Sequence, residues 1–459
     1  MQEHHAGVGR MIDQQVGQRL LRIGRPAAGD LLKPWTDVRP LGRGRGRGKH
    51  NNHGKQVQGF YHLGNYAPRP ILTTGSGRCN YVAAHRTNEE RMDTFRVVVA
   101  AGGTGGHIFP AVAVVEQLQV QTGGRCSALF LGSADRMETS LIPALGYPYI
   151  PMPIVGFRGL RSLSTLTLPW KILRSVSIAR AAIRRHRPQA VVCTGAYISY
   201  PAGIAAVKEG VPLFVLESNI NPGKTNARLA PKATAVVLAF EDSRSQYPAE
   251  LRPKLHVLGN PVRTQIDASR DAAHARTAFG LQPDRPTVLV FGGSLGARTI
   301  NDAVVSALPM LATEPYQVLW QTGASYAAPT VLPPNVRVVP FIDDMGAAYA
   351  AADLVVARSG ATTIAELGIV GKPAIFVPLP SASTDEQRRN AAAVERAGGA
   401  LVIDDRRAAT DLATSIRQLM LDVDRRAAMA TAMQQLGHPN AAANTAALIL
   451  STCGYGASL

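Results

Sequence analysis

Several features that mark whole classes of protein are missing from this sequence. It has only four cysteines in 459 residues, and they lie far apart, at Cys79, Cys126, Cys193 and Cys453. No Cys-x-x-Cys pair occurs, so the spacing predicts neither a disulfide framework nor a zinc site, and we expect buried free thiols in a reducing cytoplasm. No apolar run reaches the roughly 18 to 20 residues that span a bilayer. The N-terminus has no apolar segment typical of a secretory signal.

Two common nucleotide-binding motifs are also missing. No stretch matches G-x-x-x-x-G-K-[ST], so a P-loop kinase or ATPase lacks its lysine. Two glycine-rich runs occur, but neither matches the G-x-G-x-x-G pattern of dinucleotide-binding proteins. Ile108 stands at the third glycine position of the first run, and Leu295 breaks the second run. These departures disfavour a nicotinamide-dependent dehydrogenase.

Acidic residues are scarce relative to basic ones, which gives a formal charge of +17. Residues 1–91 hold 15 lysines and arginines against 6 acids, about half of the excess. They include the run from Gly42 to His50, which is too polar and glycine-rich to form a core, so we predict a disordered basic extension. One interpretation places it outside the folded protein, with a start near Met92. Another lets its Arg-Gly repeats bind nucleic acid or anionic lipid.

After the extension, short apolar runs alternate with helical stretches. The first run, Phe95 to Ala101, is β-branched and is followed by a glycine-rich loop and a helix over Pro110 to Gln119. This rhythm is typical of a doubly wound parallel sheet. Further strands are expected at residues 128–131, 190–193, 212–216 and 235–238.

A turn at Gly259-Asn260-Pro261 interrupts this rhythm, and a second α/β unit follows. Its first strand, Thr287 to Phe291, again leads into glycines, Gly292 to Gly296, and a helix. Later strands are expected at residues 336–340, 354–357 and 374–377. The sequence therefore predicts two Rossmann-like domains, each with a strand, glycine-loop and helix unit.

The glycine loops point to an anionic ligand. A loop between a strand and a helix leaves backbone N–H groups free at the helix N-terminus, where the helix dipole also favours diphosphate. A tight turn that needs glycine is the structural alternative for either loop alone. A third helix start, from Arg358 to Glu366, has hydroxyl residues in its first turn. Glu366 is a candidate ligand for ribose hydroxyls, although an acid near a helix N-terminus also stabilises the helix.

Together these motifs resemble the MurG family of N-acetylglucosaminyltransferases. The resemblance spans about residues 93–450. It is carried by Gly102 to His107 with Phe109-Pro110, Gly259 to Arg263, Gly292 to Arg298, Phe341 to Met345, Ser359 to Glu366, and Asp385 to Gln387 with Asn390-Ala391. It implies the two-domain fold of GT-B glycosyltransferases. It also implies inverting transfer of GlcNAc from UDP-GlcNAc to O4 of MurNAc in lipid I (undecaprenyl-pyrophosphoryl-MurNAc-pentapeptide), which forms lipid II in peptidoglycan synthesis.

The resemblance also implies a domain layout and a location. The N-terminal domain, residues 92–258, would face the acceptor and membrane, and residues 259–435 would bind UDP-GlcNAc. A C-terminal helix within residues 436–459 would pack back on the N-terminal domain. Peripheral attachment to the cytoplasmic face of the inner membrane is expected, with no specific nucleic acid partner.

Residue roles follow from the resemblance by position. Arg263 and Ser294 correspond to diphosphate and sugar-nucleotide contacts, and Ile342 to a backbone contact with uracil. Asn219 and Gln387 correspond to residues that reach the GlcNAc. The nucleotide-holding helix start comprises Ala361, Thr362, Thr363, Ile364, Ala365 and Glu366, with Glu366 on the ribose. The N-domain loop that closes the donor site comprises Thr104, Gly105 and Gly106.

Inverting transfer needs a base for the acceptor hydroxyl and positive charge for departing UDP. His107 is the candidate base, because imidazole titrates near physiological pH; a helix-capping or diphosphate-binding histidine is the alternative. Helix ends and Arg263 can stabilise UDP, so no metal ion or cofactor is expected. The sequence departs from the family at Leu216 and Ser218, where histidine and glutamine are usual, and at Ala196, where glycine is common.

The stretch from Leu166 to Arg187 interleaves apolar and basic residues, which suits an anionic membrane surface. Core packing of half its apolar residues is the alternative. Two other functions stay open from the sequence. One is a different UDP-sugar transferase or a UDP-GlcNAc 2-epimerase with the same nucleotide site. The other is a nucleic-acid-binding protein that uses the Arg-Gly extension.

Overall fold

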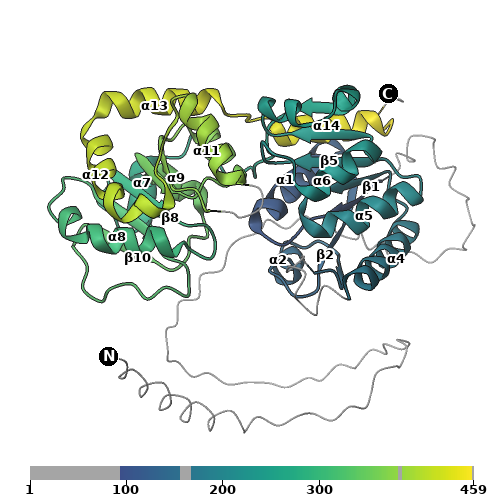
Figure 1. The fold of residues 1–459 in the computed structure, drawn as a ribbon, viewed down its shortest axis with the longest axis horizontal. Coiled ribbons are helices and arrows are strands. Elements are labelled where there is room, and N and C mark those ends of the chain that lie inside the picture. The colour runs from purple at the N-terminus through teal and green to yellow at the C-terminus, as the bar shows by residue number, and fades with distance from the viewer. Residues whose placement is uncertain (1–93, 156–166, 381–384, 457–459) are drawn as a thin grey trace, which may run out of the picture. The chain divides into compact units, whose positions relative to one another are not determined.

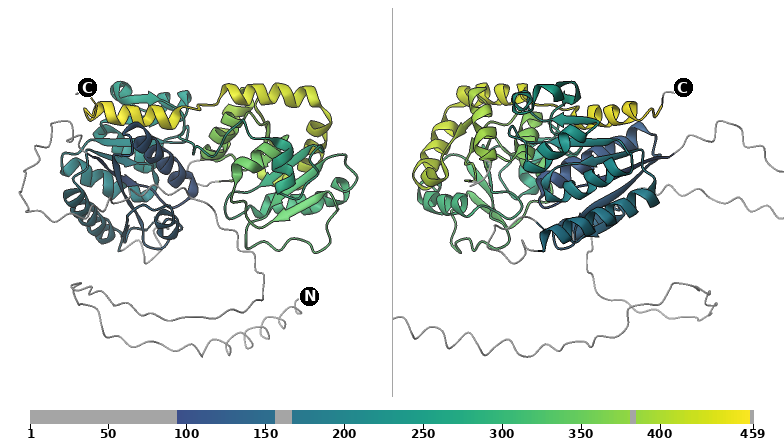
Figure 2. Two further views of the ribbon diagram at one scale, coloured as in Figure 1. Left: turned by 180° about the vertical axis from the view of Figure 1, so that it is seen from behind. Right: turned by 45° about the vertical axis from the view of Figure 1, so that its right-hand side comes forward.

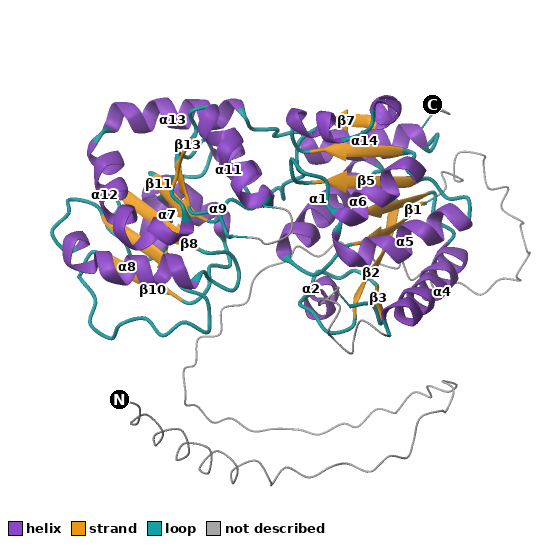
Figure 3. Cartoon of the chain, viewed as in Figure 1, coloured by secondary structure: helices purple, strands orange, loops and turns teal. Residues whose placement is uncertain are grey.

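A computed structural model describes residues 94–155, 167–380 and 385–456. The predicted extension, residues 1–91, lies outside the described residues. The described chain forms two parallel α/β sheets, one within residues 95–257 and one within residues 287–402 (Figure 1, Figure 3). This confirms the predicted fold class.

The N-terminal sheet has seven parallel strands in the order β3-β2-β1-β4-β5-β6-β7. Its strand order starts in the middle, at β1, and runs outward on both sides, as in doubly wound folds. The strands are β1 (Phe95–Ala100), β2 (Cys126–Ser133), β3 (Tyr149–Met152), β4 (Ala190–Cys193), β5 (Leu213–Glu217), β6 (Ala235–Leu238) and β7 (Leu255–Val257). The helices are α1 (Gly105–Gln121), α2 (Glu138–Ala144), α4 (Leu168–His186), α5 (Ala196–Lys208) and α6 (Lys224–Leu229), with 3-10 turns η2 (Ala230–Lys232), η3 (Glu241–Gln246) and η4 (Ala249–Lys254).

Alternate residues of the central strand β1 face two separate apolar clusters. Val98 and Ala100 pack with residues of α4 and α5, whereas Val97 and Val99 pack with residues of α1 and of the C-terminal helix. Both faces of the sheet are therefore buried, which explains why its strands are continuous apolar runs without polar alternation.

The second sheet has six parallel strands in the order β10-β9-β8-β11-β12-β13. The strands are β8 (Thr287–Phe291), β9 (Gln317–Gln321), β10 (Val336–Val339), β11 (Leu354–Ala357), β12 (Ala374–Phe376) and β13 (Ala400–Val402). The helices are α7 (Ala272–Ala278), α8 (Arg298–Leu311), α9 (Met345–Ala351), α10 (Ala361–Val370), α11 (Glu386–Arg396), α12 (Ala408–Leu421), α13 (Val423–Gln435) and α14 (Ala441–Thr452), with η5 (Asp405–Arg407). Helices α8 and α12 cover one face, and α9, α10 and α11 cover the other.

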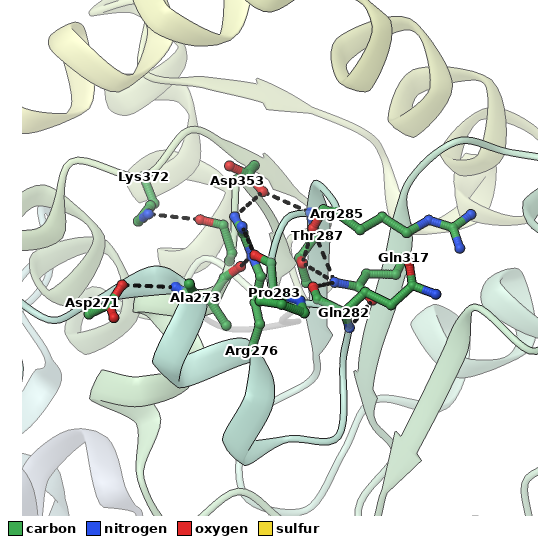
Figure 4. Close-up of polar contacts among 12 residues, drawn as sticks. Asp271, Ala273, Arg276, Gln282, Pro283, Arg285, Thr287, Gln317, Asp353 and Lys372 are labelled. Atoms are coloured by element: carbon green, nitrogen blue, oxygen red, sulfur yellow. Dashed lines mark hydrogen bonds and ion pairs between the residues drawn. The ribbon is translucent and has the colours of Figure 1, made fainter.

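A polar network anchors α7 beside this sheet (Figure 4). Asp353 forms an ion pair with Arg276 at 2.9 Å, and its carboxylate also accepts a hydrogen bond from the N–H of Thr287 at 2.7 Å. Asp271 caps α7 by accepting the N–H of Ala273, and Lys372 donates to the carbonyl of Ala352. These bonds satisfy groups at the start of β8 and of α7, so they fix the segment that leads into the second glycine loop.

The last helix, α14, lies against α1 of the N-terminal sheet rather than against the second sheet (Figure 2). Ala446 and Ile449 join the apolar cluster of Val112, and Gln121 donates to the carbonyl of Ala443 at 2.8 Å. The chain thus returns to the N-terminal domain after completing the second one.

The structure adds strands that the sequence did not predict, namely β3, β7, β9 and β13. It also begins the first helix at Gly105, five residues before the predicted start at Pro110. Among the described residues, no helix has the length and apolar character needed to cross a bilayer.

Candidate functional site

The first glycine loop places His107 on the third residue of α1. Its Nδ1 lies 2.8 Å from the carbonyl oxygen of Thr194, and the Thr194 hydroxyl donates in turn to the carbonyl of His107 at 2.8 Å. Because a carbonyl oxygen only accepts, Nδ1 carries the proton and Nε2 keeps its lone pair. Burial lowers the pKa of His107 below its usual value, with partial opposition from the Thr194 bond and the negative charge of Glu386. The imidazole is therefore neutral at physiological pH.

A cavity of about 250 Å³ opens beside His107. It is lined by His107 of α1, by the loops after β4 and β5 with the starts of α5 and α6, and by one residue of α11. The lining residues are His107, Gly195, Ala196, Tyr197, Glu217, Asn219, Gly223, Lys224, Thr225, Asn226 and Glu386. These loops follow the carboxyl ends of neighbouring parallel strands, where open α/β sheets bind ligands.

Glu217 is a buried carboxylate in this cavity wall. It accepts the N–H groups of Asn219 at 3.0 Å and Gly223 at 2.9 Å, and the side-chain amide of Asn226 at 2.8 Å. Burial outweighs these bonds and raises the pKa of Glu217 to about 6. Glu217 therefore shapes the loop that carries Asn219, and it titrates close to the physiological range.

Glu366 lies near the middle of α10 and is buried. The hydroxyl of Tyr349 donates to its Oε2 at 2.7 Å. Burial raises the pKa of Glu366, and the Tyr349 bond and the charge of Arg263 oppose that rise. One carboxylate oxygen is thus held by Tyr349, and no residue in the described part of the chain donates to Oε1.

Arg263 stacks on an aromatic ring. Its guanidinium carbon lies 3.9 Å from the centre of the Phe109 ring, a cation–π distance. Phe109 belongs to α1, two residues after His107, so Arg263 links the first glycine-loop helix to the segment that precedes the second domain. Burial raises the pKa of Glu366, and the charge of Arg263 limits that rise.

Thr362, in the first turn of α10, bonds to the first glycine loop. Its hydroxyl donates to the carbonyl of Gly106 at 3.3 Å. That carbonyl is available because the residue four positions later is Pro110, which has no N–H to complete the helical bond. A proline inside α1 therefore frees an acceptor for a contact with α10.

The second glycine loop presents an exposed tip. Ser294 and Leu295 are exposed, and the loop is held from below by Gln321, whose side chain donates to the carbonyl of Gly293 at 3.0 Å. Ile342, in contrast, is buried in the apolar cluster of α9 and α10. Neither Ser294 nor Ile342 lines the cavity beside His107.

The start of α11 connects two predicted sugar-contacting residues. Gln387 accepts the N–H of Leu379 at 2.9 Å, and its carbonyl accepts from Ser359 at 2.8 Å. Asn390 donates to the side-chain oxygen of Asn219 at 3.0 Å and accepts the N–H of Ile220 at 3.2 Å. Asn219 is therefore held from both sides, by Glu217 and by Asn390.

The structure thus groups some of the predicted residues into two sets and leaves Ser294, Ile342 and Gln387 outside both. His107 and Asn219 share the cavity, while Thr104 to Gly106, Arg263, Thr362 and Glu366 are joined by the α1 and α10 contacts. Ala361 and Ile364 are buried in α10, and Thr363 and Ala365 are half-buried. Asn226 and Tyr349 were missed by the sequence analysis. Neither belongs to a motif that suggested a role. Asn226 bonds to Glu217 and Tyr349 bonds to Glu366, and the fold brings each pair together.

Comparison with known proteins gives a consistent result. Residues 97–238 match the glycosyltransferase family 28 N-terminal domain and residues 287–445 match the family 28 C-terminal domain. A curated protein of Limosilactobacillus fermentum, named UDP-N-acetylglucosamine–N-acetylmuramyl-(pentapeptide) pyrophosphoryl-undecaprenol N-acetylglucosamine transferase, is 38% identical over 354 residues, covering 75% of this chain and 95% of the relative.

Two solved structures show the same architecture. Acinetobacter baumannii MurG is 31% identical, with a TM-score of 0.61, over 78% of this chain and 99% of that one. A UDP-GlcNAc 2-epimerase from Neisseria meningitidis has a TM-score of 0.55 over 78% of this chain and 100% of that one, at 16% identity. The second likeness shows the fold alone.

Proposed function

The chain belongs to the MurG family within the family 28 glycosyltransferases, and on that premise we propose how it transfers GlcNAc from UDP-GlcNAc to lipid I. The products are lipid II and UDP, so the protein is a hexosyltransferase of peptidoglycan synthesis. The observation that carries the mechanism is the half-buried, neutral His107, which lines the cavity and whose Nε2 has no hydrogen-bond partner among the described residues.

His107 acts as the general base. The O4 hydroxyl of MurNAc attacks the anomeric carbon of GlcNAc, its proton passes to Nε2, and the bond from that carbon to the UDP oxygen breaks with inversion. Thr194 holds Nδ1–H and so keeps Nε2 unprotonated before the reaction. The imidazolium formed afterwards lies near the negative charge of Glu386, which favours it.

The second domain holds the donor. The N-terminus of α10, with Thr362 and Thr363, receives a phosphate, and the free Oε1 of Glu366 accepts a ribose hydroxyl. Ser294 at the exposed loop tip contacts the diphosphate, Ile342 contacts the uracil through its backbone, and Gln387 and Asn219 reach the sugar. Arg263 adds positive charge near the departing UDP.

Helix α4 supports attachment to the membrane. The apolar side chains of Trp170 and Leu173 on α4 are 72% and 65% exposed, so together they present an apolar surface. Lys171 and Arg174 flank them. Val176 is instead buried in the core, and Arg180 and Arg184 form ion pairs with Glu209, so the patch is limited to the first turns of α4. We place this patch against anionic lipid on the cytoplasmic face of the inner membrane, where lipid I is anchored.

The membrane patch is tested by vesicle sedimentation. Trp170→Ala with Leu173→Ala is expected to reduce binding to vesicles that contain anionic lipid, because apolar area is lost. Val207→Ala, an exposed apolar residue on α5, is the matched control. Equal binding by the double variant and the wild type would contradict this attachment site.

The transfer itself is tested by incubating the protein with labelled UDP-GlcNAc and a lipid I analogue. We expect a lipid-linked disaccharide and free UDP. Conversion of UDP-GlcNAc to its 2-epimer without acceptor would instead support the epimerase, and transfer to a soluble acceptor alone would support another sugar transferase. Either result, with UDP-GlcNAc shown to bind, would contradict the lipid I assignment.

A further inference from the structure

A buried glutamate outside every motif named above contacts the first glycine loop. Glu138 is the first residue of α2, and its exposed fraction is 0%, although the four residues before it are exposed. Its carboxylate lies against the loop that connects β1 to α1. The adjacency of β1 and β2 in the sheet brings these segments together, 35 residues apart in the chain.

The Glu138 carboxylate accepts hydrogen bonds only from uncharged groups in the described part of the chain. Gly103 N–H lies 3.2 Å from both carboxylate oxygens. Ser133 donates to Oε1 from its N–H at 3.2 Å and from its hydroxyl at 2.5 Å. Three donor groups from two residues converge on this one side chain, so Glu138 is an anchor for the loop.

This contact explains two glycines of the first loop. A Cβ at Gly102 would lie 2.3 Å from Oε1 of Glu138, so no side chain fits there. Gly103 has φ +86°, a conformation that glycine adopts freely, and this turn aims its N–H at Glu138. Both glycines therefore fit the loop to a protein carboxylate rather than to a ligand.

The contact also determines which loop groups can meet a substrate. Gly103 N–H is taken by Glu138, and the N–H groups of His107 and Ile108 bond to the carbonyl of Thr104. The N–H groups of Gly105 and Gly106 lie in the first turn of α1, where the helix supplies no acceptor. The orientation of the Gly105 and Gly106 N–H groups, and of the His107 side chain that follows them, depends on how Glu138 anchors the loop at Gly103.

We propose that Glu138 is a positioning residue for the acceptor: by anchoring Gly103, it orients the N–H groups of Gly105 and Gly106 and the imidazole of His107 toward lipid I. This inference rests on the proposed function. Two helical N–H groups with no partner in the described ranges suit the diphosphate of lipid I. A misplacement of about 1 Å at such a site costs on the order of 10- to 100-fold in rate.

The test compares Glu138→Gln with the wild type. The amide has the same shape but puts an N–H₂ donor where one acceptor oxygen stood, against the N–H donors of Gly103 and Ser133. We expect kcat/KM for the lipid I analogue to fall about 10- to 100-fold, KM for UDP-GlcNAc to stay unchanged, and amide hydrogen exchange at Gly103 to become faster. Ser133→Ala keeps the Glu138 carboxylate and removes one of its donors. It should also lower kcat/KM for the lipid I analogue and speed exchange at Gly103, by less than Glu138→Gln does.

Glu314→Gln is the matched control, because Glu314 is a buried glutamate in the second domain that pairs with Arg417. A purely structural role for Glu138 would lower the melting temperature and the folded fraction without changing the acceptor KM of the folded enzyme, and that result would overturn the proposal. Slower transfer without faster exchange at Gly103, or faster exchange without slower transfer, would also overturn it. If the wild type made no lipid-linked product, the proposed function would fail, whereas exchange at Gly103, which needs no turnover, would still test the anchor.

Discussion

The two glycine loops of this chain have similar sequences and occupy equivalent places in their domains, but the fold uses them differently. The first is anchored by the side chain of Glu138 and carries His107 into a cavity. The second is held by the side chain of Gln321, which donates to the carbonyl of Gly293, and packs so closely on Thr322 that a Cβ at Gly296 would lie 2.0 Å from its carbonyl oxygen. Its tip exposes Ser294. One loop presents an imidazole, and the other presents a hydroxyl and a helix N-terminus. A glycine pattern alone therefore indicates that a helix start is accessible, without indicating the chemistry it performs.

The largest expected effect comes from removing the base. His107→Gln should lower kcat about 10²- to 10⁴-fold, the range for loss of general base catalysis, while UDP affinity stays the same. Steady-state transfer and calorimetric binding of UDP measure the two quantities. His186→Gln is the matched control, because His186 also bonds to a backbone carbonyl, that of Ser127, and lies on α4. Near wild-type turnover in His107→Gln would contradict the assignment of His107 as the general base.

The second domain should respond in the donor parameters. Glu366→Ala is expected to raise KM for UDP-GlcNAc about 10- to 100-fold, because a buried carboxylate that accepts from a ligand hydroxyl contributes roughly 1.5 to 3 kcal/mol. Tyr349→Phe removes only the hydroxyl that donates to Oε2 of Glu366, so it should raise KM for UDP-GlcNAc by less. Acceptor KM should not change in either variant. An increase in acceptor KM alone would contradict the assignment of this domain to the nucleotide.

The cavity wall should make stability depend on pH through Glu217. Its pKa of about 6 in the folded protein exceeds the ordinary 4.5, so the folded state holds the proton more tightly than the unfolded chain does. The stability from this group is full below pH 4.5 and is lost as pH rises through 6, a difference of about 2 kcal/mol. Urea unfolding from pH 4.5 to 7.5 should show this loss in the wild type and not in Glu217→Gln. Parallel pH profiles of the two proteins would contradict the raised pKa.

The smallest effect is expected at the contact between the first loop and α10. Thr362→Val removes the hydroxyl that bonds to the Gly106 carbonyl, and a neutral hydrogen bond contributes about 0.5 to 1.5 kcal/mol. Transfer should fall a few-fold. Thr431→Val, on α13, removes a comparable hydroxyl that bonds only within its own helix. Equal rates in both variants would show that this bond has no part in the reaction.

Much of the fold could be predicted because its central strands are buried on both faces. β1, β8 and β11 are uninterrupted apolar runs, and their predicted ranges match the structure to within a residue. β9 was missed because buried glutamines stand at both its ends, Gln317 and Gln321, each satisfied by hydrogen bonds that periodicity does not reveal. β3 contains Pro151, and β7 and β13 have three residues each, of which only the first is buried, so neither forms a fully buried apolar run.

Residues of the candidate site could be predicted only where they belong to a motif of consecutive residues. His107 and Asn219 were found by motif, and the fold then placed them in one cavity. The partners that set their chemistry were not predictable. Thr194 reaches His107, Tyr349 reaches Glu366 and Glu138 reaches Gly103 through strand order, which no local pattern encodes. The roles of these residues toward the substrates stay predictions until they are measured.

The most direct test of the difference between the loops uses one substitution in each. Gly106→Ala and Ser294→Ala are compared by measuring KM for both substrates and the affinity for UDP. A Cβ at Gly106 would meet no atom closer than 3.6 Å, and Gly106→Ala should impair the lipid I analogue alone. Closure of Thr104 to Gly106 over the donor, which the family resemblance implies, would instead predict a change in KM for UDP-GlcNAc. Ser294→Ala should weaken UDP-GlcNAc and UDP alone. If both substitutions changed the same substrate's KM, the two loops would not divide acceptor and donor between them, and the account would be wrong.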